Sequence, residues 1–278
     1  THRLGGRWDS KLRRFDGADW DLEIGIITEL QLKSQTSPLL LFDKIKGYPA
    51  GYRVASNLFS THNRVAAVLD IPQHLKGKEL VMAWREKVKA GVIALPPIKV
   101  KQGEVMENMQ QDGQVDLLKF PVPKWHELDG GRYLGTGHVV ITRHPEEGWV
   151  NLGTYRLQVH EPSVATIHMS PGRHCEMIAK NYWKKGENCP IAVTCGQDPA
   201  IYAASTSSLG WGSSEYNYAG WLRGEPVQVI DGPVTGLPIS ATAEIALEGE
   251  LLPPEKELKQ EGPFGEWTGH YGIGKWGG

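Results

Sequence analysis

Two glutamates lie five residues apart around a turn that is rich in glycine and proline, Glu261-Gly-Pro-Phe-Gly-Glu266. The proline restricts the backbone before Phe264, and Gly265 permits a close approach or a positive φ directly before the second carboxylate. Such a turn can aim two acids at one small volume, where one holds a proton and the other accepts it. On these residues alone, the alternative is a pair of solvated surface charges.

Arg156 is the cation that would complete this group, although it is distant in the sequence. If Arg156 reaches the same volume, the set becomes an acid, a base and a cation. Such a set could bind a carboxylate substrate and move a proton. The alternative is that Arg156 is an ordinary strand residue, because residues 150–159 alternate as a strand does.

A second group consists of Asn151, His174 and Glu215, which supply an amide oxygen, an imidazole and a carboxylate. This set suits Mn²⁺ or Mg²⁺ and contains no soft ligand. The spacing of the three residues is not a recognised short metal motif. From residue type alone, a hydrogen-bonded core asparagine, a surface histidine and a solvated glutamate are a more frequent outcome than a metal site.

Residues 170–186 show the signals of a helix: Ser170 as cap, Pro171 at the first position, two lysines in the last turn and a glycine after it. The amino end offers unpaired N–H groups with Arg173 and His174 in the first turn, so it could bind a phosphate. The alternative is a capped helix start without a ligand. Glycine-rich loops of the Walker or Rossmann type are absent from the sequence.

The composition is that of a globular protein with one large or two ordinary domains, at 278 residues with 40% hydrophobic residues. The net charge of −2 provides no general field for a nucleic acid or an anionic membrane, so neither is expected as a partner. Cys175, Cys189 and Cys195 form no CxxC pair and suit a reducing compartment. Since no signal peptide and no apolar run of about 18 residues is visible, we expect a cytoplasmic protein.

The first part of the chain mixes helical and strand patterns. Residues 37–46 open with a cap and a proline, which predicts a short helix, and residues 75–90 form a second predicted helix that ends at Gly91. Residues 64–69 have the pattern of a strand, and the proline-rich segment at 95–100 indicates a boundary or a sheet edge. These patterns predict an α/β unit.

From Val115 onward the pattern changes to short strands that turns separate. Short strands at this spacing favour a barrel or a sandwich, so the predicted fold class is α+β. Turns at 144–148 and 161–163 should join neighbouring strands as hairpins. The predicted strands are residues 137–143, 150–159, 164–169, 226–230 and 239–247.

Four segments, in this order, closely resemble the UbiD family of reversible decarboxylases, which use prenylated FMN. They are residues 121–137, 151–158, 214–227 and 261–266. The resemblance is strong from Val115 to Gly272 and weak before it. It implies an amino-terminal α/β domain, residues 1–114, followed by a split β-barrel of the flavin-reductase type, residues 115–278. Family members continue past this point with a carboxyl-terminal domain that completes the substrate pocket, so this chain is expected to lack that domain.

The resemblance also implies roles for individual residues. Arg156, Glu261 and Glu266 match the catalytic set, and Asn151, His174 and Glu215 match the ligands of a divalent metal, Mn²⁺ or Mg²⁺. The residues at flavin-contacting positions are Thr154, Tyr155, Arg156, His168, Met169, Ser170, Arg173 and Ser205. The residues at the potassium (K⁺) site of some members are Trp149, Ala204, Ser205 and Ser207.

The implied activity is the reversible, non-oxidative decarboxylation of an aromatic or α,β-unsaturated carboxylic acid. The modified flavin supplies the electron sink that no side chain can provide. Arg156 would hold the substrate carboxylate, and Glu266, buried beside the flavin, would donate the proton while Glu261 bridges it to Arg156. A flavin prenyltransferase would supply the cofactor, and the protein would form a homo-oligomer, a dimer or a hexamer. The alternative function is a non-catalytic flavin- or phosphate-binding subunit of a multicomponent carboxylase.

Overall fold

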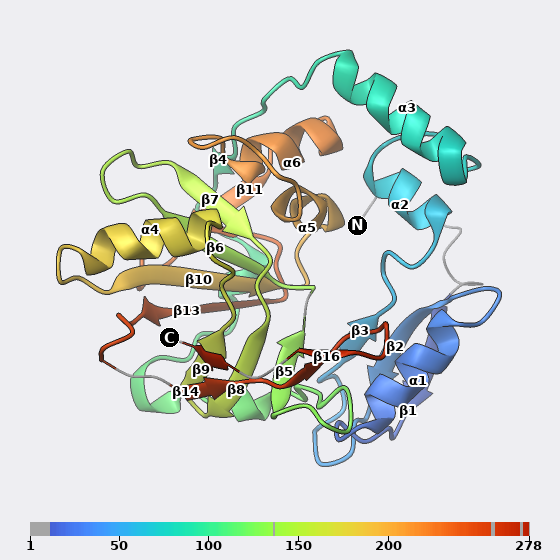
Figure 1. Cartoon of the computed structure of the whole chain (residues 1–278), viewed down its shortest axis with the longest axis horizontal. Helices are drawn as coiled ribbons and strands as arrows, with labels where there is room; N and C mark the ends of the chain where they lie inside the picture. Colours follow the sequence, from blue (N-terminus) through green and yellow to red (C-terminus); the bar gives the residue numbers. More distant parts are fainter. Residues whose placement is uncertain (1–11, 136, 257–258, 273–274, 278) are drawn as a thin grey trace.

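The computed structural model describes residues 12–135, 137–256, 259–272 and 275–277. The chain begins with a three-stranded sheet in which β1 (Leu12–Asp16) pairs in parallel with β2 (Leu39–Asp43), and β3 (Val54–Ser56) pairs antiparallel with β2. Helix α1 (Glu23–Leu32) covers this sheet (Figure 1). A small separate core lies between them, where Ile24 and Phe42 are fully buried.

Two predictions in this region are wrong. The helix predicted at residues 37–46 is strand β2, in which Leu40 and Phe42 are fully buried while their neighbours are less so. This alternation has the period of a strand, and the pairing with β1 outweighs the cap and proline signals.

The strand predicted at residues 64–69 falls largely within helix α2 (His62–Val68). Arg64 is 2% exposed, and its guanidinium donates to the carbonyl oxygens of Leu58 at 2.9 Å and Ser37 at 2.7 Å. The bond to Leu58 is local and the bond to Ser37 is long-range, and together they favour the helical backbone here over the local strand pattern.

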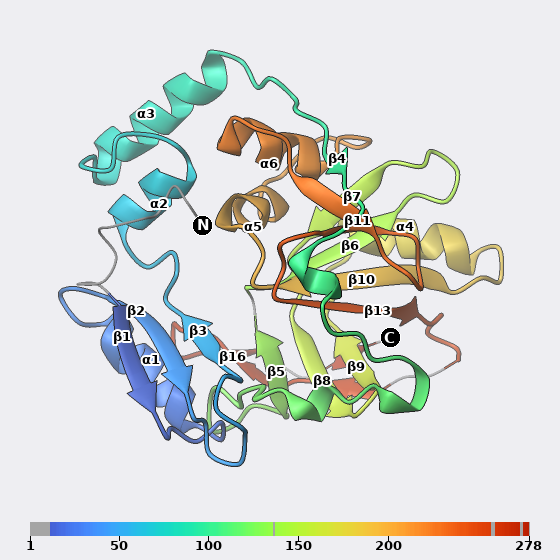
Figure 2. The same ribbon diagram turned by 180° about the vertical axis from the view of Figure 1, so that it is seen from behind.

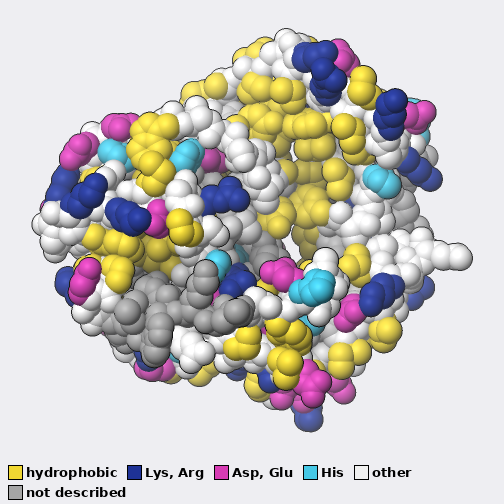
Figure 3. Space-filling view, viewed as in Figure 1, with side chains coloured by type: hydrophobic (Ala, Val, Ile, Leu, Met, Phe, Trp, Pro, Cys, Tyr) yellow, Lys and Arg dark blue, Asp and Glu magenta, His cyan; other side chains and the backbone are white. Residues whose placement is uncertain are grey.

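Helix α3 (Gly77–Lys89) confirms the helix predicted at 75–90. None of its residues is buried, and Val81, Met82 and Val88 are exposed. Its contact with the rest of the chain includes Trp84, whose ring lies 5.8 Å from that of Trp221. Apolar side chains accordingly gather on the surface over α2 and α3 (Figure 3).

The central sheet has the strand order β13-β10-β6-β7, and every neighbouring pair is antiparallel. Its strands are β6 (Val139–Arg143), β7 (Val150–Gly153), β10 (Cys189–Cys195) and β13 (Ile245–Leu251). Val139 and Ile141 pack on the side of α5 (Pro199–Ser205) and α6 (Glu215–Arg223), whereas Val140 packs on the side of α4 (His174–Trp183). The sheet is therefore buried on both faces, and helices lie on either side of it (Figures 1 and 2).

The remaining strands form smaller sheets. Their bounds are β4 (Ile98–Lys99), β5 (Arg132–Gly135), β8 (Leu157–Glu161), β9 (Val164–Ile167), β11 (Gln228–Asp231), β12 (Pro238–Ser240), β14 (Lys259–Glu261), β15 (Phe264–Gly265), β16 (Tyr271–Gly272) and β17 (Lys275–Gly277). Three short 3₁₀ turns precede β5, at Glu104–Met106, Asp112–Gln114 and Leu117–Lys119. The pairing orders are β12-β11-β4, β5-β8-β9, β14-β17 and β15-β16.

The mixed α+β class is confirmed, but the split barrel is not, because the described strands pair as separate sheets without closing into a barrel. Strand β4 pairs in parallel with β11. The segment at residues 98–99 therefore joins a sheet of the second half, and the boundary at residue 114 stays a prediction.

Both predicted hairpins are present, between β6 and β7 and between β8 and β9. The single strand expected at 150–159 is two strands with a break at residues 154–156, and the strand expected at 239–247 is split between β12 and β13. Helix α4 begins at His174 with Arg173 as its cap, so Ser170 is not the cap. Gly172 has a φ of 81°, which keeps residues 170–172 outside the helix.

The three cysteines are free thiols. Among the described residues, no helix combines the length and the apolar character that crossing a bilayer requires.

Candidate active site

A break between β7 and β8 brings Arg156 into the site. His138, which is 1% exposed, donates from Nε2 to the carbonyl oxygen of Tyr155 at 2.5 Å. The backbone N–H of His168 donates to the carbonyl oxygen of Arg156 at 3.0 Å. These bonds satisfy the carbonyls of Tyr155 and Arg156 without strand pairing, which allows the strand to break here.

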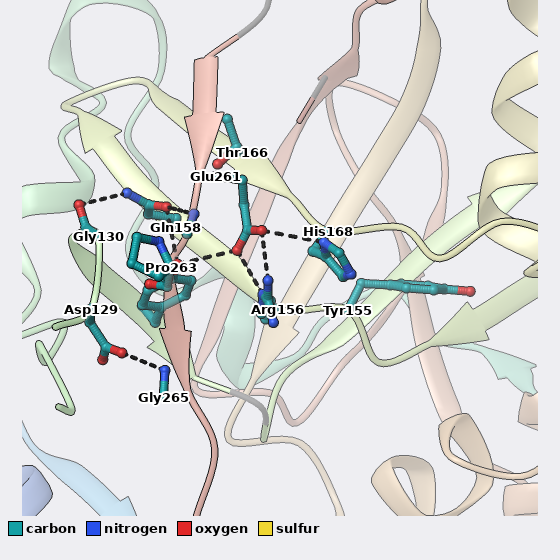
Figure 4. Close-up of polar contacts among 12 residues, drawn as sticks. Asp129, Gly130, Tyr155, Arg156, Gln158, Thr166, His168, Glu261, Pro263 and Gly265 are labelled. Atoms are coloured by element: carbon teal, nitrogen blue, oxygen red, sulfur yellow. Dashed lines mark hydrogen bonds and ion pairs between the residues drawn. The ribbon is translucent and has the colours of Figure 1, made fainter. Parts of the chain in front are cut away.

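Arg156 and Glu261 form a bidentate ion pair in the interior. Arg156 donates from Nε to Oε1 of Glu261 at 2.7 Å and from Nη2 to Oε2 at 2.8 Å (Figure 4). The Glu261 side chain is 1% exposed, and His168 Nδ1 lies 3.3 Å from its Oε2. Burial lowers the pKa of Arg156, but the hydrogen bonds and charge of Glu261 outweigh it and the pKa is raised. Arg156 therefore reaches Glu261, as the hypothesis from the sequence required.

The turn after Glu261 is held by a backbone and side-chain frame. Gly262 N–H donates to Oε1 of Gln158 at 2.8 Å, and Gly130 N–H donates to the carbonyl oxygen of Pro263 at 2.7 Å. Gly265 N–H donates to Oδ1 of Asp129 at 2.7 Å (Figure 4). Three hydrogen bonds from separate positions therefore fix a turn of six residues.

Glycine is required at this turn for the reasons that the sequence suggested. A Cβ on Gly265 would lie 2.7 Å from Cγ of His126, so the predicted close approach is confirmed. The positive φ occurs at Gly262, which has a φ of 88°. A Cβ on the facing Gly130 would lie 2.1 Å from the carbonyl oxygen of Gly262, which a side chain there could not avoid.

Glu266 follows this turn directly. The side chain of Glu266 is exposed, so the expectation that it is buried is wrong for the described chain. Its backbone N–H donates to the carbonyl oxygen of His270 at 2.8 Å, and its charge acts on Arg156. Within the described ranges no hydrogen bond joins Glu261 and Glu266. The proposed bridge is therefore present only between Glu261 and Arg156.

A second buried acid lies on α6, against strand β7. Asn151 donates from Nδ2 to Oε1 of Glu215 at 3.1 Å, and the backbone N–H of Leu152 donates to Oε2 at 2.7 Å. Asn151 and Glu215 are 3% and 2% exposed, and burial raises the pKa of Glu215 to about 7. Oδ1 of Asn151 is buried without a hydrogen-bond partner. An unpartnered amide oxygen beside a carboxylate is a donor set that fits a hard divalent cation.

In the part of the chain that the structure describes, His174 makes no hydrogen bond to this pair. Its ring meets the edges of Trp149 and Trp211 at centroid distances of 5.5 and 5.4 Å. Burial, and then the charge of Arg173, lower the pKa of His174, which favours the neutral form that ligates metals. Among the described residues no group of three or more His, Cys, Asp and Glu side chains is arranged as a metal site. The hydrogen-bonded pair of Asn151 and Glu215 is therefore the part of the predicted metal site that the structure brings together, and His174 as a third ligand stays a prediction.

The residues at the flavin-contacting positions follow the same stretch of chain. Thr154 Oγ1 lies 2.9 Å from Oγ of Ser205, and the hydroxyl of Tyr155 accepts from Cys175 N–H at 3.4 Å. His168 and Met169 are partly exposed, and Ser170 and Arg173 are exposed ahead of α4. The segment from 151 to 156 thus connects the buried oxygen pair to the Arg156–Glu261 pair, with accessible polar groups between them.

The residues at the potassium positions lie mostly in and around α5. Ser205 Oγ donates to the carbonyl oxygen of Tyr202 at 2.7 Å, and Ser207 Oγ donates to that of Ala203 at 3.0 Å. Ala204 is fully buried in the core. These serine hydroxyls therefore already make local helix bonds, and a potassium site stays a prediction.

The sequence did not indicate four buried polar residues around the site: Asp129, Tyr133, His138 and Gln158. Asp129 and Tyr133 lie within the segment 121–137, so its polar residues were the available signal. His138 and Gln158 occupy positions whose neighbours have the pattern of a strand. Nothing in a single sequence identifies His138 as a partner of the strand break or Gln158 as a partner of the turn.

His138 gives the fold a defined dependence on pH. Burial lowers its pKa from the ordinary value of 6.5 to about 4, since the hydrogen bonds it makes only partly offset the loss of solvation. The unfolded chain therefore binds a proton that the folded chain rejects between these two values. Stability from this group is complete above pH 6.5 and is lost as the pH falls toward 4, by roughly 3 kcal/mol. Chemical unfolding at pH 7 and pH 4.5 should show this loss in the wild type and a smaller loss in His138→Gln; equal losses would contradict the assignment.

The chain matches two family models that together cover most of its length. The family model for the 3-octaprenyl-4-hydroxybenzoate carboxy-lyase Rift-related domain matches residues 98–276, and the model for the N-terminal domain of the same lyase matches residues 9–84. The chain therefore belongs to the UbiD family.

Curated relatives include decarboxylases of aromatic acids. The chain is 36% identical over 267 residues to a pyrrole-2-carboxylic acid decarboxylase of Pseudomonas aeruginosa, covering 92% of this chain and 52% of the relative. It is 33% identical to a phenolic acid decarboxylase of Streptomyces sp., covering 87% of this chain and 50% of the relative. The chain thus spans about half the length of the curated relatives that it matches.

Solved structures share the fold. The UbiD-class enzyme HmfF from Pelotomaculum thermopropionicum, in complex with FMN, superposes with a TM-score of 0.85 at 29% identity, covering 96% of this chain and 57% of that one. An evolved dimeric form of HmfF in complex with prFMN gives a TM-score of 0.84 at 27% identity, covering 96% and 60%. The closed form of vanillic acid decarboxylase from Sedimentibacter hydroxybenzoicus gives 0.87 at 25% identity, covering 97% and 57%.

Proposed function

We propose that this chain carries the catalytic machinery of a reversible, non-oxidative decarboxylase that acts on an aromatic or α,β-unsaturated carboxylic acid with prenylated FMN and a divalent metal. The observation that best supports the proposal is the buried Arg156–Glu261 ion pair, with Glu266 at the other end of the turn that Glu261 begins. The acids named for the relatives, pyrrole-2-carboxylic and phenolic acids, support an aromatic substrate.

Arg156 is suited to hold a substrate carboxylate. It donates to Glu261 through Nε and Nη2, so Nη1 remains to donate to a second carboxylate. A guanidinium can serve two carboxylates at once because its donors form a planar fork. Glu261 compensates the positive charge of Arg156 when the substrate is absent and fixes its plane when the substrate is bound.

Glu266 is the proposed proton donor. The flavin, when bound, supplies the electron sink on which loss of CO₂ depends. Glu266 then protonates the substrate carbon that carried the carboxyl group, and its carboxylate accepts that proton in the reverse direction. The exposure of Glu266 leaves it accessible to substrate and solvent in the described chain.

The metal would bind at Asn151 and Glu215, with His174 as the third ligand. The buried Oδ1 of Asn151 lacks a partner, and the carboxylate of Glu215 is held beside it. A divalent cation there would offset the charge of the flavin phosphate next to Glu215. Thr154, His168, Ser170 and Arg173 would then contact the flavin.

Glu215→Ala should lose flavin and metal together, because the phosphate and the protein carboxylate need a cation between them. Metal content and flavin absorbance of the purified protein measure both. Glu79→Ala, which removes an exposed glutamate on α3, is the control and should retain both. Full flavin occupancy after exhaustive chelation would count against the Asn151, His174 and Glu215 assignment.

The proposal is tested by making the full-length protein together with a flavin prenyltransferase. The mass and absorbance of the released ligand should be those of prenylated FMN, and aromatic acids such as pyrrole-2-carboxylate should release CO₂. We further propose a homo-oligomer and a potassium ion near Trp149 and Ser207, which sedimentation and metal analysis of the same sample would examine. A ligand that is absent, or bound without turnover of any acid, would reject the enzymatic proposal.

A further inference from the structure

The hydroxyl of Tyr133 faces three acceptors but carries one proton. Its oxygen lies 3.2 Å from Oε1 of Glu261, 3.1 Å from Oε1 of Gln158 and 3.3 Å from the carbonyl oxygen of Pro263. Tyr133 is fully buried, so water does not compete for this proton. Only one of the three can receive the O–H at a time.

The charge of Glu261 decides which acceptor receives the proton of Tyr133. Gln158 donates from Nε2 to the carbonyl oxygen of Gly130 at 3.1 Å and accepts at Oε1 from Gly262 N–H at 2.8 Å (Figure 4). Its Oε1 therefore already has one donor, just as Oε1 of Glu261 has one in Arg156 Nε, so occupancy does not separate the two acceptors but charge does. A carboxylate is the stronger acceptor, because a hydrogen bond to a charged group is shorter and stronger than one to a neutral group. The Tyr133 proton consequently goes to Glu261.

Tyr133 remains a donor under ordinary conditions. Burial, and then the charge of Glu261, raise the pKa of the Tyr133 hydroxyl, so it stays neutral. Its ring is also fixed, because it packs against Phe264 of the same turn at a centroid distance of 4.6 Å. The hydroxyl therefore reaches Glu261 from a rigid support.

We propose that Tyr133 is a positioning residue for Arg156 that acts through Glu261. Oε1 of Glu261 receives Arg156 Nε and Tyr133, and Oε2 receives Arg156 Nη2 with His168 Nδ1 close by. Tyr133 is the second donor on Oε1 and the third on the carboxylate, and it stops the carboxylate from turning about its Cγ–Cδ bond. The plane of the paired guanidinium is thereby fixed, and so is the direction of Nη1.

The consequence for substrate rests on the proposed function. If Nη1 of Arg156 holds the substrate carboxylate, Tyr133 sets where that carboxylate lies. Loss of the hydroxyl should then weaken substrate binding more than it slows the chemical step, so KM should rise more than kcat falls.

The direct test is solvent exchange of the Arg156 Nε–H, followed by ¹⁵N NMR of this chain and identified by its loss in Arg156→Lys. Tyr133→Phe removes the hydrogen bond from Tyr133 to the charged carboxylate of Glu261, so Glu261 should hold the Arg156 Nε–H less firmly. The exchange rate of that N–H should rise about tenfold. Tyr216→Phe is the matched control: Tyr216 is 1% exposed and its hydroxyl donates to the carbonyl oxygen of Pro238 at 2.7 Å, so the same group is deleted elsewhere in the interior. The control should leave Arg156 exchange unchanged. An unchanged rate in Tyr133→Phe would overturn the proposal.

A second variant covers the case in which Tyr133→Phe does not fold. 3-Fluorotyrosine placed only at residue 133 keeps the ring and has a more acidic, stronger donor, so it should slow the exchange at Arg156; an unchanged or faster rate would overturn the proposal. Kinetics of the flavin-loaded full-length enzyme then give the change in KM. Absence of decarboxylation in the wild type would reject the proposed function and leave the exchange result standing, so the two failures are distinguishable.

Discussion

Arg156→Lys is expected to lower kcat/KM of the flavin-loaded enzyme by at least ~10²-fold, although the charge is kept. Arg156 serves Glu261 with two donors, at 2.7 and 2.8 Å, and in the proposed complex its Nη1 would hold the substrate carboxylate. A lysine ammonium is a single point of charge that cannot hold two carboxylates in one plane. Steady-state kinetics with the preferred aromatic acid measure the loss.

Arg143→Lys is the control for this substitution. Arg143 lies at the end of β6 and donates from Nη2 to the carbonyl oxygen of Gly236 at 2.9 Å, a single bond that lysine can replace. Its kcat/KM should stay near that of the wild type. Near-normal turnover in Arg156→Lys would remove Arg156 from the catalytic set and leave it as a residue that holds the turn.

Glu266→Gln is expected to lower kcat by at least ~10²-fold, the effect of losing a positioned acid, while flavin and metal remain bound. Glutamine keeps the size and the hydrogen bonding of glutamate but cannot give up and regain a proton. Since Glu266 is exposed and its side chain does not support the turn, the substitution should leave the unfolding midpoint unchanged. Single-turnover kinetics with the flavin-loaded protein separate the chemical step from binding.

Glu266→Asp is the matched variant for this prediction. It keeps a titratable carboxyl group and shortens its reach, so it should retain measurable turnover. If Glu266→Gln and the wild type turn over equally, Glu266 is not the donor, and the turn that carries it is a structural corner.

The sequence predicted the constrained turn at Glu261 but left its meeting with Arg156 as a condition. Gly262 and Gly265 mark a backbone that only glycine allows at those positions, and this signal is local. The family resemblance, and not the residues themselves, predicted that the two segments lie close together in the fold. Periodicity alone left Arg156 within a continuous strand, whereas the structure breaks that strand at residues 154–156.

The two wrong predictions of secondary structure in the first part of the chain share one physical cause. Residues 37–46 and 64–69 are short, so their local signals are weak, and each has a long-range partner that decides its backbone. Strand β2 pairs with β1, and Arg64 of α2 binds the carbonyl oxygen of Ser37. Neither pairing can be read from the segment itself.

The buried polar residues that hold the turn after Glu261 could not be predicted from the sequence, for a similar reason. Gln158 and Tyr133 are polar residues on neighbouring strands β8 and β5, and their role depends on the register that places them opposite each other. Their burial, at 3% and 0% exposure, could be known only from the fold. The burial expected of Glu266 was likewise an inference about surroundings, and the described chain leaves this residue exposed.

The proposed chemistry is tested most directly by decarboxylation in D₂O with the flavin-loaded full-length enzyme. We predict that the wild type places one deuterium at the carbon that lost CO₂ and that Glu266→Gln, with its flavin still bound, does not do so at a comparable rate. Mass spectrometry of the product gives both the amount and the position of the label. Incorporation by Glu266→Gln at the wild-type rate would contradict the assignment of Glu266 as the donor, and absence of labelled product from the flavin-loaded wild type would contradict the proposed decarboxylase itself.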